Sequence, residues 1–204
     1  MNKKIISTSA VKEMEKTVSL LNGLFKEVHT AFMKNRLSLK YRQTLEEANK
    51  TIRQSLVNFY EAAAEMGGGE EALSVQATAI NLSKIFYDLV RLANQVEKKI
   101  GEKILFSDEA VAEMDDLLRR TIDLLPHVAD GLRTCNALIV SHVEKEADEL
   151  RKNAANSTAF HEDRLCKGKC HPKASIIYMQ MLQHLQDILW HFKALVCDKG
   201  IPGA

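Results

Sequence analysis

Apolar residues recur every three or four positions along nearly the whole chain, which is the spacing of helices that bury one face. In the first segment they step by four, three, four, three and four, at Met14, Val18, Leu21, Phe25, Val28 and Phe32. Five later segments repeat this spacing. Stripes of this kind pack against one another, so the sequence predicts an all-α fold.

Turn-forming residues divide these stripes into six helices. Gly67-Gly68-Gly69 separates the second helix from the third, and Gly101 is expected to end the third helix as a C-terminal cap. Ser107 is expected to cap the fourth helix, because its hydroxyl can accept from free N–H groups there. Pro172 suits the first turn of the last helix.

The two halves of the chain repeat one architecture. We therefore predict two tandem three-helix bundles, residues 1–101 and residues 107–198, joined by a short linker at 102–106. Gly and Pro, with nine and three residues, are too few for a many-stranded β fold.

Composition narrows the class of protein. The formal net charge of +1 indicates neither a nucleic-acid partner nor an anionic membrane surface. The N-terminal residues lack the apolar stretch of a signal peptide. The longest strictly apolar runs, such as residues 137–140, fall far short of the roughly 20 residues of a spanning helix. We expect a cytoplasmic protein without direct membrane insertion, with its four cysteines reduced.

Two stretches in the second half resemble a known family. Residues 106–114, Phe-Ser-Asp-Glu-Ala-Val-Ala-Glu-Met, are similar to the start of the second bundle in the PhoU family of phosphate-uptake regulators. Residues 161–170, from His161 to Cys170, are similar to that family's turn before its last helix. The match is closer to the PhoU-like cytosolic domain of bacterial Na/phosphate cotransporters. The resemblance implies the two-bundle fold and a role in phosphate uptake.

The family's acidic Glu-x-x-x-Asp pattern, whose carboxylates hold metal clusters in PhoU, is eroded in this chain. Val90 and Asn94 replace the two acids on the third helix, and Gln186 and Trp190 replace them on the last. Such loss predicts no multinuclear metal cluster, and no cofactor is expected.

One acidic pair keeps the family's spacing. Glu144 and Asp148 lie four residues apart on one helix face and are candidate ligands for a single divalent metal ion. The competing interpretation is a solvated face among neighbouring charges.

Two groups of histidine and cysteine residues offer other ligands. His161, Cys166, Cys170 and His171 have zinc-type chemistry, but their spacing is not that of a zinc finger. His184 and His191, seven residues apart, indicate either a common site or the seam of a bundle.

The sequence contains no nucleophile motif and no phosphate-binding glycine loop, so we do not expect an enzyme. The resemblance implies a non-catalytic regulator or adaptor of phosphate transport or phosphate signalling, which contacts a phosphate transporter or a phosphate sensor protein. The alternative is a metal-binding helical-bundle protein, and a homodimer stays open.

The last helix is the candidate contact surface. Gln186, Trp190 and His191 stand where the family places metal ligands, and Trp is enriched at binding hot spots. The competing interpretation is that Trp190 fills the core.

Overall fold

A computed structural model describes residues 8–65 and 67–197 of the chain. The described residues form six helices and no strand, which confirms the all-α prediction. The helices are α1 (Thr8–Lys34), α2 (Tyr41–Glu65), α3 (Glu70–Gly101), α4 (Asp108–Thr134), α5 (Ala137–Cys166) and α6 (Pro172–Cys197).

Side-chain caps explain where two of these helices begin. The Ser107 hydroxyl oxygen accepts from the backbone N–H of Ala110 at 3.3 Å and caps α4, as the sequence predicts. The Asn136 side-chain oxygen accepts from the Leu138 N–H at 2.9 Å and caps α5.

The helix α3 ends at Gly101 as the sequence predicts, but Gly101 does not itself cap it, because Glu102 holds the cap position. Gly101 is the last residue of α3, and Lys103 adopts the left-handed conformation at φ 55°. A similar left-handed turn ends α4 at Cys135, with φ 50°. The Cys135 side chain at this turn is exposed.

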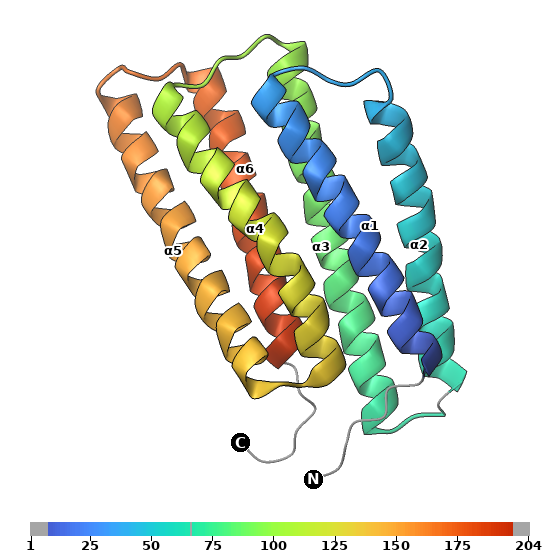
Figure 1. Cartoon of the computed structure of the whole chain (residues 1–204). Helices are drawn as coiled ribbons and strands as arrows, with labels where there is room; N and C mark the ends of the chain where they lie inside the picture. Colours follow the sequence, from blue (N-terminus) through green and yellow to red (C-terminus); the bar gives the residue numbers. More distant parts are fainter. Residues whose placement is uncertain (1–7, 66, 198–204) are drawn as a thin grey trace.

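Four helices occupy the centre of the molecule. α1 packs against α3 and α4, and α6 packs against the same two helices (Figure 1). α2 covers the outer side of α1 and α3, and α5 covers the outer side of α4 and α6. One cluster of buried apolar side chains contains residues of all six helices. The division into two three-helix bundles stays a prediction.

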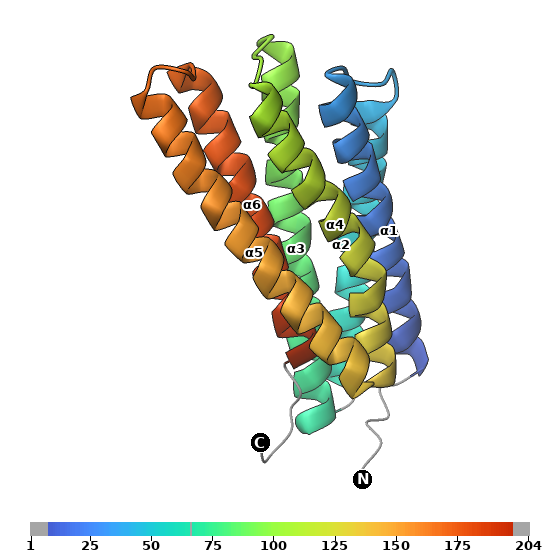
Figure 2. The same cartoon turned by 60° about the vertical axis from the view of Figure 1, so that its left-hand side comes forward.

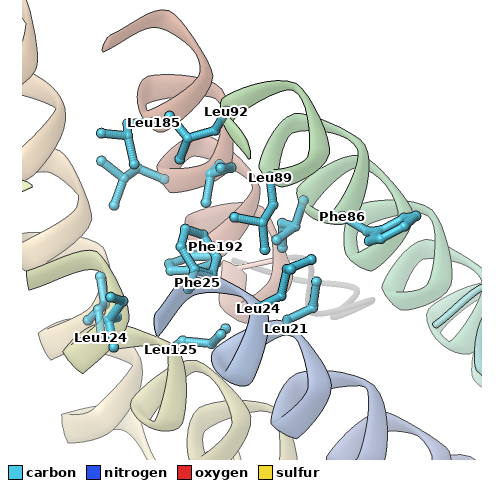
Figure 3. Packing of buried hydrophobic residues seen from close by; sticks show 14 of the residues in the cluster. Leu21, Leu24, Phe25, Phe86, Leu89, Leu92, Leu124, Leu125, Leu185 and Phe192 are labelled. Atoms are coloured by element: carbon cyan, nitrogen blue, oxygen red, sulfur yellow. The ribbon is translucent and has the colours of Figure 1, made fainter. Parts of the chain in front are cut away.

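The predicted apolar stripes form this core. Leu21 and Leu24 of α1, Leu89 of α3 and Leu125 of α4 point toward one another around the centre (Figure 3). Each of these side chains is almost fully buried, so it contributes the roughly 1.5–3 kcal/mol typical of a buried leucine.

Three helix connections lie at one end of the molecule. They are residues 35–40, 102–107 and 167–171, and we call this end the loop end (Figure 1). The helices fan apart toward it (Figure 2). α3 and α6 run antiparallel along their shared seam (Figure 1). Among the described residues, no helix is both long enough and apolar enough to cross a bilayer.

Candidate functional site at the seam of α3 and α6

A polar cluster lies on the seam between α3 and α6. His184 Nδ1 of α6 is 3.5 Å from Asp88 Oδ1 of α3, and Asp187 follows one turn after His184. One ligand atom from each residue lies within 4.8 Å of the others. We call Asp88, His184 and Asp187 the seam cluster.

Asp88 is charged at neutral pH despite its burial. Its side chain is only 9% exposed, and burial alone would raise the pKa of the carboxyl. The nearby His184 imidazole and the hydrogen bond from Arg91, whose Nη1 lies 3.1 Å away, outweigh burial and leave the pKa of Asp88 lowered. The cluster therefore presents a fixed anion beside an imidazole.

His191 lies deeper along the same seam. Its Nδ1 is 2.9 Å from the side-chain oxygen of Asn81, and both residues are buried. Because that oxygen only accepts, the Nδ1 of His191 carries the proton. Burial, followed by the charge of Lys84, lowers the pKa of His191, so the ring is neutral. Of the two predictions for His184 and His191, a common site or a seam between helices, this geometry favours the seam.

Trp190 lies on the surface over this seam. It is 49% exposed, so the interpretation that it fills the core is wrong. Its ring meets the His191 ring edge to face, with the centroids 4.8 Å apart. Ile80 and Tyr87 of the neighbouring α3 are also exposed, and Arg53 of α2 lies over the Tyr87 ring, 5.7 Å from its centroid. We call Ile80, Tyr87 and Trp190 the seam face.

The other predicted contact residues are less accessible. Gln186 is half-buried, and the His191 side chain lies beneath the surface with its Asn81 bond. Of the three predicted contact residues, Trp190 is the one that offers a large exposed surface.

Asp148 of the acidic pair on α5 is held by cations of the protein. Lys193 donates to Asp148 at 2.6 Å, and Arg151 lies 3.9 Å from the same carboxylate. Glu144 is half-buried. Within the part of the chain that the structure describes, Glu144 and Asp148 belong to no group of three close metal-ligating atoms. This arrangement favours the interpretation of a charged, solvated face.

The cysteine and histidine residues near the last turn do not converge either. The described side chains of His161, Cys166, Cys170 and His171 form no group of three ligand atoms within 4.8 Å. Cys166 and Cys170 are free thiols, and His171 Nδ1 accepts from the Lys173 N–H at 3.1 Å. The Cys197 side chain lies outside the described residues.

Sequence reasoning missed the seam cluster. Asp88 lies two residues before the eroded motif on α3 and Asp187 lies within the motif on α6, but neither occupies one of its two acidic positions. A signal was present, since His184 and Asp187 are three residues apart and share a helix face. Their pairing with Asp88, nearly 100 residues earlier, depends on how α3 packs on α6.

Comparison with protein-family models, with curated proteins and with solved structures finds no match for this chain.

Proposed function

We propose that the protein is a PhoU-like, non-catalytic regulator that binds a phosphate transporter or a phosphate sensor through its seam face. The observation that carries the proposal is the half-exposed Trp190. A tryptophan ring buries up to about 250 Å² when it is covered, so leaving it in water forgoes much apolar stabilisation. The exposed position of the Trp190 ring therefore supports a partner protein that covers this ring.

The support beneath Trp190 favours binding as well. Its ring rests on His191, and His191 is held by Asn81 within the seam. A side chain that is already ordered loses less conformational entropy when a partner covers it. Ile80 and Tyr87 expose further apolar surface on the neighbouring α3, with the charged Arg53 over the Tyr87 ring and the exposed Lys84 between them in sequence.

Contact alone is sufficient for such a role. A regulator that binds one conformation of a transporter more tightly than another shifts the transporter toward that conformation. No bond has to be made or broken, so the proposal assigns no catalytic residue.

The test compares capture by wild type and by Trp190→Ala, from cells grown with and without phosphate. Because Trp190 is half-exposed, the variant should keep its melting temperature within about 2 °C. It should lose a phosphate transporter or sensor that the wild type captures, at a cost of about 2 kcal/mol or more in binding.

Phe160→Ala is the matched control, because Phe160 is another exposed aromatic residue but lies on α5. This control should capture partners as the wild type does. If Trp190→Ala captures the same partners with the same yield, the seam face is not the contact surface. If the captured partners have no connection with phosphate transport or sensing, the proposed role is wrong.

The seam cluster favours a second candidate function, the binding of one divalent cation. Two carboxylates and an imidazole suit Zn²⁺ or Mn²⁺, with Arg91 displaced from Asp88. Calorimetric titration with Zn²⁺ tests it, with Asp187→Asn expected to weaken binding at least tenfold. Asp163→Asn, an exposed acid on α5, is the control. Equal affinity of wild type and Asp187→Asn would remove this candidate.

A further inference from the structure

A cavity of about 170 Å³ opens at the loop end, far along α6 from the seam face. Three parts of the chain enclose it: the connection into α4 with the first turn of α4, the end of α5, and the connection into α6 with the first turn of α6. The lining residues are Leu105, Phe106, Ser107, Ala110, His161, Lys169, Cys170, His171 and Ala174.

His161 is the unusual residue in this lining. It is only 3% exposed, and neither of its ring nitrogens has a hydrogen-bond partner. One face of the ring lies against Tyr178, with the centroids 4.6 Å apart. Buried polar groups without a partner are rare in folded proteins, so these two nitrogens call for an occupant of the cavity.

The ionisation of His161 defines what that occupant meets. Burial, with the nearby Arg164 charge, lowers the pKa of His161. The ring is therefore neutral at pH 7 and offers one N–H donor and one acceptor lone pair. Because Arg164 is paired with both oxygens of Glu113, at 2.8 and 3.0 Å, it does not itself occupy the cavity.

Charge around the cavity favours an anion on the side of α6. Lys169 supplies an exposed ammonium group, and the first turn of the 26-residue α6 contains no acidic residue. The positive end of a helix dipole attracts anions. The start of α4 is different, because Asp108 and Glu109 already occupy it and the Glu109 carboxylate bonds its own backbone N–H and Ser107.

The opposite wall is apolar. Leu105, Phe106 and Ala110 line it, and the Phe106 ring is held edge-on against Tyr178 at 5.5 Å. We propose that the cavity binds a small organic oxyanion. Its carboxylate or phosphate head lies at His161, Lys169 and the start of α6, and its short apolar body lies against Phe106 and Leu105.

A metal ion fits this cavity less well. His161, Cys170 and His171 would have to supply the ligands, but the described side chains bring no three such atoms within 4.8 Å here. His171 Nδ1 is also engaged by the Lys173 N–H.

An occupant would bridge three helices. His161 of α5 rests on Tyr178 of α6, whose hydroxyl donates to Glu113 of α4. A ligand held by His161 and Lys169 therefore fastens the α5–α6 connection to this network. The protection of that connection against amide hydrogen exchange should rise on binding.

The test titrates the full chain with phenyl phosphate, benzoate, inorganic phosphate and benzyl alcohol, and follows the imidazole C–H signals of His161 by NMR. Phenyl phosphate or benzoate should shift the His161 signal to saturation, and the better of the two identifies the head group. Inorganic phosphate should bind at least tenfold more weakly, because it has no apolar body.

Variants locate the site. Lys169→Gln should lower the affinity about tenfold, whereas Lys167→Gln should not change it, because Lys167 is paired with Asp163 and does not line the cavity. His161→Phe keeps a ring against Tyr178 and removes both nitrogens, so it should abolish binding, which the C–H signals of His171 in the cavity lining report in this variant. Trp190→Ala should bind the aromatic anion as the wild type does. The result of this test is therefore independent of whether the seam face binds a partner protein.

Three results would overturn the proposal. Benzyl alcohol binding as tightly as phenyl phosphate would make the cavity a neutral apolar site. Equal losses for Lys167→Gln and Lys169→Gln would indicate diffuse surface charge. No saturable shift of His161 with either aromatic anion would mean that the cavity has no such ligand, and this holds whether or not His161→Phe folds.

Discussion

Phe25 of α1 and Phe192 of α6 meet edge to face across the centre of the core, with ring centroids 6.5 Å apart (Figure 3). Both side chains are fully buried. The backbones of α1 and α6 are diagonal in the central group of four helices and do not pack directly. This aromatic pair therefore connects the first helix of the chain with the last.

Truncating either ring should strongly destabilise the protein. Phe192→Ala removes a fully buried ring and should cost about 3–5 kcal/mol in the free energy of unfolding. Urea denaturation measures this cost, and Phe160→Ala, at an exposed position, should stay within about 0.5 kcal/mol of wild type. A double-mutant cycle of Phe25→Ala and Phe192→Ala should give a coupling of about 0.5–1.5 kcal/mol. A coupling of zero would mean that the two rings do not interact.

Two helical glycines should respond differently to alanine. A Cβ at Gly23 of α1 meets nothing within 4 Å, so Gly23→Ala should stabilise the protein by up to about 1 kcal/mol. A Cβ at Gly131 of α4 would lie 3.2 Å from Val196 Cγ1 and 3.6 Å from Ile139 Cγ2. Gly131→Ala should therefore stabilise the protein less than Gly23→Ala does, or should destabilise it. Thermal unfolding of the two variants compares them, and a larger gain at Gly131 would contradict this packing.

Stability should fall as the pH drops below about 6.5. Burial lowers the pKa of His161 and of His191 below the ordinary value of 6.5, so the unfolded chain binds more protons in that range. The contribution of both neutral rings to the free energy of unfolding is complete above pH 6.5. It is lost as the pH falls toward the pKa values that the two rings have in the folded protein. Denaturation midpoints at pH 7.5, 6.5 and 5.5 measure the loss. His161→Phe should make it smaller, and an unchanged slope in that variant would contradict the role of His161.

Glu113 joins three helices, and its charge should matter to stability. It accepts from Arg164 and from the Tyr178 hydroxyl. Burial alone would raise its pKa, but these hydrogen bonds leave the pKa below the ordinary 4.5, so its contribution is lost as the pH falls below 4.5. Glu113→Gln should cost about 2 kcal/mol at pH 7, measured by urea denaturation. Asp163→Asn, which breaks only the exposed pair with Lys167, should cost under about 1 kcal/mol.

The helices and their buried faces followed from the sequence because helix periodicity is a local property. The stripe of α6, from Ile177 to Leu195, is buried as its spacing predicts. The cap at Ser107 was also predictable, since its bond spans three residues. The turn after Gly101 was not, because Lys103 adopts the left-handed conformation that glycine would usually supply.

The site depends on relationships that local patterns do not contain. Asp88 meets His184 only because α3 and α6 run antiparallel with one particular register. Trp190 and His191 are adjacent in sequence, yet one is half-exposed and the other buried. Which of two neighbours faces a seam depends on the rotation of the helix, and composition does not reveal it.

The pairing of the central helices has a consequence for assembly. The interface between the first three helices and the last three consists of α1 on α4 and α3 on α6. If each helix of the first half is exchanged with its counterpart in the second half, the same two helix pairs result. An interface with that property is isologous, the kind that two identical subunits use in a two-fold dimer. If the chain straightens at residues 102–107, each half can make the same helix pairs with the complementary half of a second copy. Protein concentration then decides between a closed monomer and an exchanged dimer with the same core.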